Sequence, residues 1–148
     1  MCELTPSIEP DPVHVVAGII LDASSRVLIA RRPQHLHQGG LWEFPGGKRH
    51  DSESPELALK RELAEELALE VIESRHFLTV RHRYSDKAVL LDFYLVAKFD
   101  GEPKGNEGQP VRWVELTELS AYPFPEANWP VIERLQNIVR DDAIVKLR

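Results

Sequence analysis

The chain has 148 residues, a length that suits one domain able to bury its own core without disulfides. Hydrophobic residues make up 43% and charged residues 28% of it, which excludes disordered and fibrous classes. The formal net charge of -6 argues against an extended nucleic-acid surface, because a phosphate backbone needs a basic stripe, but it allows a small anionic ligand accompanied by a metal.

The first part of the chain is predicted to be a leader followed by two strands. We expect residues 1–12 to be a flexible leader and residues 13–148 to form a single domain. Residues 13–21 are almost entirely apolar, which is typical of a buried strand, and residues 26–30 form a second apolar run. The polar turn at 22–25 between these runs predicts a hairpin.

The strongest helix signal follows a loop at residues 31–40 and a short apolar run at 41–44. Ser54 has the side chain of an N-cap, and Pro55 suits the first helical position. Residues 56–69 hold good helix formers and no glycine. The sequence therefore predicts a helix over 56–69.

The second half of the chain is predicted to contain strands and a closing helix. Strands are expected at residues 71–80, 88–99 and 111–114, separated by polar or Gly- and Pro-rich connections. A helical turn is expected at 117–119. Apolar residues recur at helical spacing between 129 and 140, which predicts an amphipathic final helix.

Three glutamates of the predicted helix lie on one face. At about 100° per residue, Glu62, Glu65 and Glu66 fall within roughly a 100° arc. Like charges at this spacing destabilise a helix by about 0.2 to 0.5 kcal/mol per pair in water, and more when partly buried. A bound cation would offset the repulsion, and oxygen ligands suit Mg²⁺, with Mn²⁺ as the alternative. On spacing alone a solvated face, with Lys60 and Arg61 pairing to the acids, is the commoner explanation.

The residues around these glutamates resemble the Nudix box. Residues 47–53 read GKRHDSE and, after seven further residues, 61–69 read RELAEELAL. The resemblance is closest to the MutT-like subgroup and extends on both sides, through LWEFPGGK before the helix and through EGQP and FPEANWPVI after it. It implies an α/β fold, an α/β/α sandwich with a mixed β-sheet, in which the box forms a catalytic loop-helix-loop.

The resemblance also implies a set of groups around a divalent metal, Mg²⁺ or Mn²⁺. These groups are the Gly46 carbonyl and the carboxylates of Glu62, Glu65, Glu66 and Glu107. Glu53 is implied to lie nearby, and Arg61 to orient a helix carboxylate. The proton acceptor favoured by the resemblance is Glu62, with Glu53 and Glu107 as rivals. Outside this context Glu107 would be interpreted as an ordinary surface acid.

Five residues are implied to contact a nucleoside triphosphate: Arg32, Phe44, Lys48, Lys87 and Asn128. The Asn128 amide offers a donor and an acceptor to a purine edge, although helix capping is the ordinary role of an isolated asparagine here. Phe44 is equally interpretable as a core residue, and the three cations as solvated surface groups. Lys87 stands where the subgroup has arginine.

The resemblance predicts hydrolysis of a nucleoside triphosphate to a monophosphate and pyrophosphate. The leading substrate is 8-oxo-dGTP, whose removal would prevent misincorporation of oxidised guanine during DNA replication. The alternatives are another nucleotide such as CTP or dCTP, a capped RNA end, and a non-catalytic nucleotide-sensing module. None of the box glutamates is missing, which disfavours the last alternative. We expect a monomer or weak dimer with no stable nucleic-acid binding.

Three positions depart from the usual box. Ala68 replaces a glycine, and alanine costs about 1 kcal/mol if this position needs a left-handed conformation. His50 replaces an acid and Ser52 a glycine in the loop before Glu53. The histidines at 35, 37, 50, 76 and 82 show no metal-ligand spacing and are expected in loops or on the surface.

The sequence predicts a cytoplasmic protein without membrane contact. The only cysteine, Cys2, cannot form an internal disulfide, which favours a reducing compartment. Residues 1–11 lack the basic start and apolar core of a secretory signal. The longest apolar run, 88–99, is interrupted by Asp92 and Lys98 and is too short to span a bilayer.

Overall fold

The computed structural model describes residues 12–36 and 38–140. In chain order, the elements of this part are β1 (Val13–Ile20), β2 (Arg26–Arg31), β3 (Trp42–Glu43), β4 (Gly46–Lys48), α1 (Pro55–Leu67), β5 (Glu70–Arg83), β6 (Ala88–Asp100), β7 (Val111–Glu115), the 3-10 helices η1 (Leu116–Ala121) and η2 (Glu126–Asn128), and α2 (Trp129–Arg140). The predicted leader lies outside the described residues apart from Pro12. None of the described helices has the length and apolar character needed to cross a membrane.

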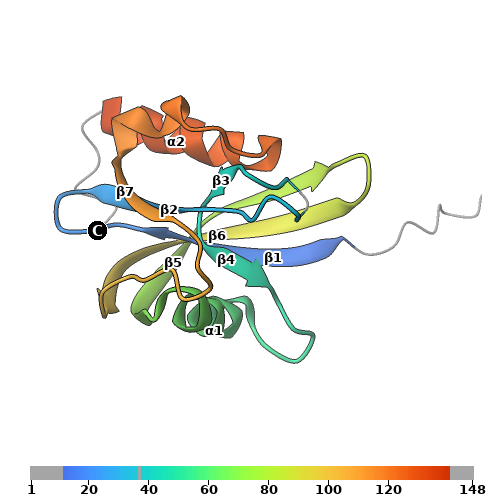
Figure 1. Cartoon of the computed structure of the whole chain (residues 1–148), viewed down its shortest axis with the longest axis horizontal. Coiled ribbons are helices and arrows are strands. Elements are labelled where there is room, and N and C mark those ends of the chain that lie inside the picture. The colour runs from blue at the N-terminus through green and yellow to red at the C-terminus, as the bar shows by residue number, and fades with distance from the viewer. Residues whose placement is uncertain (1–11, 37, 141–148) are drawn as a thin grey trace, which may run out of the picture.

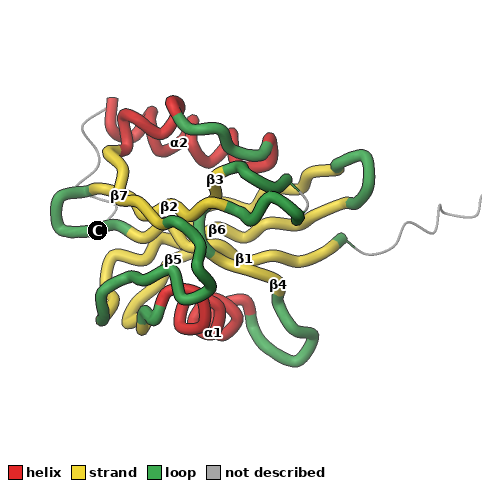
Figure 2. Tube along the Cα trace, viewed as in Figure 1, coloured by secondary structure: helices red, strands yellow, loops and turns green. Residues whose placement is uncertain are grey.

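The strands form two sheets. A mixed four-stranded sheet has the order β4-β1-β6-β5, in which β1 and β6 run parallel and the outer pairs are antiparallel. An antiparallel three-stranded sheet has the order β3-β2-β7. The strands lie between α1 on one side and α2 on the other (Figure 1), and the layer of strands is yellow between red helices in Figure 2. The expected α/β/α sandwich with a mixed sheet is confirmed.

Strand β1 is buried on both faces. Ala17 and Ile19 belong to the core cluster that contains the apolar residues of α2. Val16 and Ile20 belong to the cluster that contains those of α1. Successive side chains of a strand point to opposite faces, so a strand covered on both sides has an uninterrupted apolar sequence. The apolar run at 13–21 reflects this double burial.

The predicted hairpin between 13–21 and 26–30 is wrong. The two strands meet only at one antiparallel bridge, between Leu21 and Val27, and then enter different sheets. The turn itself is present, because the Asp22 carboxylate accepts a backbone hydrogen bond from Arg26 at 2.8 Å. Local turn residues reverse the chain, but they leave open which strands pair beyond the turn.

Helix α1 begins as the sequence predicts. The Ser54 hydroxyl accepts a hydrogen bond from the Leu57 backbone N–H at 3.2 Å, and Pro55 is the first helical residue. The apolar face packs against β1, where a Cβ added to Gly18 would lie 3.1 Å from Leu63 Cδ1. The buried leucines of this face each contribute about 1.5 to 3 kcal/mol; they are Leu59, Leu63 and Leu67. A Cβ at Gly18 would require the Leu63 side chain to shift by a few tenths of an ångström, so the helix packs closely on the sheet here.

The predicted strands at 71–80, 88–99 and 111–114 are confirmed. Strand β5 continues through residues that the sequence assigned to a polar connection, and ends at Arg83. It pairs with β6 through an antiparallel ladder interrupted by register shifts, which allow a long strand to bend. The helical turn expected at 117–119 lies within η1.

The end of α1 depends on a left-handed alanine. Ala68 has φ 58° and ψ 33°, and its backbone N–H donates to the Ala64 carbonyl at 3.1 Å. This conformation costs a residue with a Cβ about 1 to 2 kcal/mol, whereas glycine adopts it freely. The departure from the usual box at this position therefore lowers the stability of the fold.

We predict that Ala68→Gly raises the free energy of unfolding by about 1 kcal/mol, because it removes the Cβ strain. The midpoint of thermal unfolding should rise by about 2 to 4 °C. The matched control is Ala64→Gly, at an exposed right-handed position of the same helix, which should destabilise by about 1 kcal/mol. Equal effects of the two substitutions in urea or thermal unfolding would contradict the explanation.

Candidate active site

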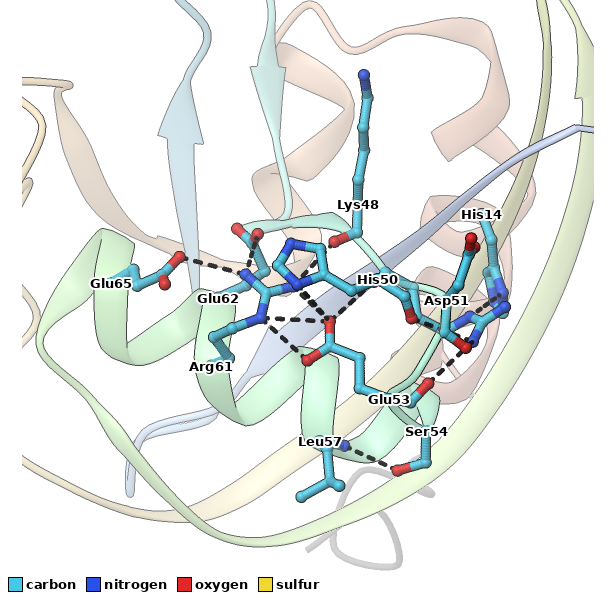
Figure 3. Close-up of polar contacts among 11 residues, drawn as sticks. His14, Lys48, His50, Asp51, Glu53, Ser54, Leu57, Arg61, Glu62 and Glu65 are labelled. Atoms are coloured by element: carbon cyan, nitrogen blue, oxygen red, sulfur yellow. Dashed lines mark hydrogen bonds and ion pairs between the residues drawn. The ribbon is translucent and has the colours of Figure 1, made fainter.

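Arg61, in the middle of α1, is the centre of the polar contacts drawn in Figure 3. Its Nε donates to both Glu53 carboxylate oxygens, at 3.2 and 3.0 Å, and its Nη2 donates to Glu53 Oε1 at 2.5 Å. Its Nη1 reaches Glu62 Oε1 at 2.9 Å and Glu65 Oε1 at 3.3 Å. Its Nη2 also donates to the Lys48 carbonyl at 3.0 Å. One guanidinium therefore joins three of the predicted carboxylates to the end of β4.

The contacts of Glu53 make it a poor proton acceptor. Hydrogen bonds from Arg61, together with the His50 backbone N–H, lower the pKa of Glu53 to about 2. The same ion pair raises the pKa of Arg61 above its ordinary value. A carboxylate with so low a pKa is a weak base at neutral pH, because proton transfer to it is unfavourable.

Glu66 lies on the buried side of α1, where it is 8% exposed. Burial, together with the charges of Glu43, Glu62 and Glu107, raises its pKa to about 8, although a hydrogen bond from the Gly46 backbone opposes this rise. The carboxylate atom Oε2 has no hydrogen-bond partner among the described residues. An unpartnered buried carboxylate oxygen beside other acids is costly unless a cation binds there.

Four of the five predicted metal ligands line one cavity of about 560 Å³: Gly46, Glu62, Glu66 and Glu107. Gly47 allows the Glu62 carboxylate to lie against the backbone, because a Cβ there would be 2.2 Å from Glu62 Oε2. Glu65 has a side chain 57% exposed and pairs with Arg61 instead. Across residues 12–36 and 38–140, no three acidic or histidine side chains already converge as a metal cluster. The oxygen-only donor set and the unpartnered Glu66 oxygen nonetheless fit a hard divalent ion.

A loop between β6 and β7 carries Glu107 to this cavity. The Asn106 backbone N–H and the Gln109 side-chain amide donate to the Glu66 carbonyl at 3.0 and 3.2 Å. The Asn106 side chain donates to the Glu65 carbonyl at 3.3 Å, and the Glu107 N–H donates to Gln109 Oε1 at 3.0 Å. These bonds satisfy carbonyls that the end of a helix leaves without partners. The helix end thereby holds the loop that presents Glu107.

A second cavity, of about 150 Å³, adjoins the first and shares Arg32, Glu43 and Gly46 with it. It is lined by all five residues predicted to contact the nucleotide: Arg32, Phe44, Lys48, Lys87 and Asn128. Much of its remaining wall is apolar, formed by Val13, Val15, Val89 and Leu91. Apolar walls with a few convergent polar groups are typical of a small-molecule site.

Phe44 and Asn128 are buried at this cavity. Phe44 is 2% exposed and packs with ring centroids 5.9 Å from Phe93 and 5.3 Å from Phe124. It is therefore a core residue that also borders the cavity, and its contact with a nucleotide stays a prediction. Asn128 is 7% exposed and ends η2, immediately before α2. Its amide is a buried polar group at the wall of the cavity.

Glu43 and Tyr84 are polar cavity residues that were not predicted as site residues from the sequence. Glu43 borders both cavities and accepts from Arg32 Nη1 at 2.8 Å. Burial raises the pKa of Glu43 and the Arg32 charge opposes that effect. Glu43 is the only acid in the otherwise apolar run 41–44, and this position could have indicated a buried functional acid. Tyr84 lines the second cavity and accepts from the Ala127 backbone N–H at 3.3 Å, but nothing in its local sequence indicated this position.

The chain belongs to the Nudix family, because the model of the NUDIX domain matches residues 16–134. It is 38% identical over 126 residues to the 8-oxo-dGTP diphosphatase of Escherichia coli K12, covering 85% of this chain and 98% of that protein. It is 36% identical over 121 residues to the CTP pyrophosphohydrolase of the same organism, covering 82% and 89%. A solved MutT structure, from work on the Aliivibrio salmonicida and Vibrio cholerae proteins, has a TM-score of 0.75 at 42% identity, covering 86% and 98%.

We predict that Mg²⁺ stabilises the fold more at about pH 8.5 than at about pH 6.5, because ligands must be deprotonated to bind metal. Glu66 has a pKa of about 8 in the folded chain against an ordinary value of 4.5. Its contribution to stability without metal is therefore full below about pH 4.5 and is lost as the pH rises through about 8.

Thermal unfolding with Mg²⁺ and with EDTA measures both effects. The Glu66→Gln variant should lose less stability than wild type over this pH range in EDTA, and should gain less from Mg²⁺. Glu133→Gln, on the exposed side of α2, is the matched control. A Mg²⁺ effect that is independent of pH and equal in Glu66→Gln would contradict this placement of the metal ligands.

Proposed function

We propose that this chain hydrolyses a nucleoside triphosphate to a monophosphate and pyrophosphate, with 8-oxo-dGTP as its substrate. The junction of the two cavities carries the proposal. One cavity offers apolar walls and the buried Asn128 amide, and the other offers the carboxylates of Glu62, Glu66 and Glu107. A nucleotide lying across the junction would place its base in the cavity of about 150 Å³ and its triphosphate in the cavity of about 560 Å³.

The donor set of the carboxylate-lined cavity, of about 560 Å³, would hold a divalent cation, Mg²⁺ or Mn²⁺. The proposed ligands are Gly46, Glu62, Glu65, Glu66 and Glu107; Glu65 would have to leave Arg61 to join the others. When bound, such an ion supplies positive charge against the triphosphate and lowers the pKa of water. Arg32 lines both cavities and Lys48 lines the cavity of about 150 Å³, and both are proposed to add positive charge where the triphosphate crosses the junction.

Glu62 is the proposed proton acceptor. Water attacks the β phosphorus, the bond from this phosphorus to the oxygen bridging the α and β positions breaks, and the water proton passes to a Glu62 oxygen. The monophosphate keeps the bridging oxygen, and the pyrophosphate keeps the oxygen from water. Arg61 orients Glu62 through the 2.9 Å bond from Nη1. Glu53, with its pKa of about 2, serves instead to hold Arg61.

Asn128 is the proposed reader of the base. Oxidation of guanine at C8 turns the N7 acceptor into an N–H donor, and the amide oxygen of asparagine accepts such a hydrogen bond. Burial of Asn128 removes competing water from this contact. The similarity to the Escherichia coli 8-oxo-dGTP diphosphatase supports this choice of substrate.

A cytidine triphosphate is the second candidate substrate. The CTP pyrophosphohydrolase relative matches most of this chain at an identity close to that of the diphosphatase. The same cavities and the same cleavage would serve either nucleotide. The two candidates differ in which base hydrogen-bonds to the Asn128 amide.

We infer that the protein acts in the cytoplasm as a monomer or weak dimer on free nucleotides. Its net charge of -6 opposes binding to a nucleic-acid backbone. Removal of oxidised nucleotides before DNA replication is the proposed role. The 13–148 segment is proposed to act as one domain.

We predict that Glu62→Gln lowers kcat for 8-oxo-dGTP by about 100-fold to 10,000-fold, because the amide cannot accept the proton from water. Steady-state release of pyrophosphate with Mg²⁺ measures this loss. Glu133→Gln makes the same chemical change on α2, away from the cavities, and should keep wild-type kcat. Full activity of Glu62→Gln would move the proton acceptor to another residue.

We predict that Asn128→Ala lowers the preference for 8-oxo-dGTP over dGTP by about tenfold or more, because a good base contact discriminates by roughly 1 to 3 kcal/mol. The measurement compares kcat/KM for 8-oxo-dGTP, dGTP, dCTP and CTP in wild type and variant. A wild-type preference for CTP or dCTP would select the second candidate substrate. Unchanged selectivity of Asn128→Ala would remove Asn128 from base recognition.

A further inference from the structure

A chain of hydrogen bonds joins the mixed sheet to the β4–α1 loop (residues 49–54). Asp92 of β6 accepts from Nε2 of His14, on the neighbouring strand β1, at 2.6 Å. Nδ1 of the same ring accepts from Arg49 Nε at 2.8 Å. Arg49 Nη1 then donates to three loop carbonyls, those of His50, Asp51 and Glu53, at 3.3, 3.4 and 2.9 Å.

These bonds fix the state of the His14 ring. A guanidinium only donates hydrogen bonds, so the Nδ1 that receives one carries no proton. The ring proton is therefore on Nε2 and is donated to Asp92. His14 is 20% exposed and Asp92 13% exposed in this pair, so water competes weakly for it.

Asp92 is itself held in place by further hydrogen bonds, so it fixes the position of the His14 ring. Its other oxygen, Oδ1, accepts from the Thr79 hydroxyl at 2.5 Å and pairs with His76 Nε2 at 2.9 Å, both from β5. Burial alone would raise the pKa of Asp92, but the hydrogen bonds from Thr79, His76 and His14 hold it below its ordinary value. Asp92 thus links three strands of the sheet, β1, β6 and β5.

The β4–α1 loop, which is hydrogen-bonded to Arg49, sets the position at which Glu53 contacts Arg61. Between β4 and α1 the chain has no helix or strand. The Glu53 backbone is bonded to Arg49, and its carboxylate is bonded to Arg61, which in turn bonds Glu62. Figure 3 shows His14 and Asp51 at one end of this set of contacts, and Glu62 and Glu65 at the other.

We propose that His14 and Asp92 are positioning residues for the hydrolysis, which act through Arg49 to hold the β4–α1 loop and so the Glu53–Arg61–Glu62 contacts. This inference rests on the proposed function. Neither residue lines the two cavities described above. Val13 and Val15, on either side of His14 in β1, line the nucleotide cavity, whereas the His14 ring bonds to Arg49. Loss of the ring should therefore change kcat and leave KM nearly unchanged.

The test is a set of matched variants in steady-state hydrolysis. His14→Leu removes both ring hydrogen bonds and should lower kcat about tenfold, with KM within about twofold of wild type. His14→Gln keeps an acceptor for Arg49 and a donor for Asp92, and should recover most of the lost kcat. His76→Leu also removes a bond to Asp92, but not one to Arg49, and should stay within about twofold of wild type.

A double-mutant cycle distinguishes positioning from general damage. Arg49→Met should lower kcat as His14→Leu does, and the pair should be little worse than either alone, because the two act in one chain. Thermal unfolding identifies the temperatures at which every variant is folded. Unchanged kcat in His14→Leu overturns the proposal, as does a loss that adds fully to that of Arg49→Met or that His14→Gln fails to recover.

Two measurements without substrate separate this inference from the proposed function. Long-range ¹H–¹⁵N NMR should show the His14 proton on Nε2, and amides of residues 49–54 should exchange faster in His14→Leu than in wild type or His14→Gln. If wild type hydrolyses no nucleotide, the proposed function fails, and these measurements then decide whether His14 holds the loop. A proton on Nδ1, or equal exchange in all variants, overturns the inference even in an active enzyme.

Discussion

The site depends on one electrostatic constraint, the burial of a carboxylate beside other carboxylates. Glu66 is 8% exposed, and Glu43, Glu62 and Glu107 raise its pKa together with burial. Such a group disfavours the folded state unless it is protonated or meets a cation. One of its oxygens has no partner among the described residues, which adds to this cost, and the all-oxygen donor set fits a hard metal ion that would offset it.

The fold brings these charges together from three separate segments. Helix α1 supplies Glu62 and Glu66, the β6–β7 loop supplies Glu107, and β4 supplies Gly47, which leaves room for the Glu62 carboxylate. The helix is held by the Ser54 cap and its buried leucines, and the loop by hydrogen bonds from side-chain amides to helix carbonyls. Arg61 then restrains Glu53, Glu62 and Glu65 with a single guanidinium.

The sequence predicted those helices and strands that depend on residues close together in the chain. The Ser54 cap and the helix formers predicted α1, and the uninterrupted apolar run at 13–21 predicted a buried β1. The hairpin of β1 and β2 failed because strand pairing is decided by distant partners, here β6 and β4 for β1. The box motif singled out Glu62 and Glu66, and an acid within an apolar run was the only sequence signal for Glu43. Tyr84 could be placed only by the fold. The His14–Asp92 and Arg49–His14 bonds join residues 78 and 35 positions apart, which no local pattern reports.

The most direct measurement of the central claim is hydrolysis of 8-oxo-dGTP with Mg²⁺ in ¹⁸O-labelled water, with products followed by ³¹P NMR and mass spectrometry. The two-cavity site, with Glu62 activating water at the β phosphorus, predicts one monophosphate and one pyrophosphate per turnover and the label in pyrophosphate. Release of orthophosphate, label in the monophosphate, or no turnover of any nucleoside triphosphate would contradict it.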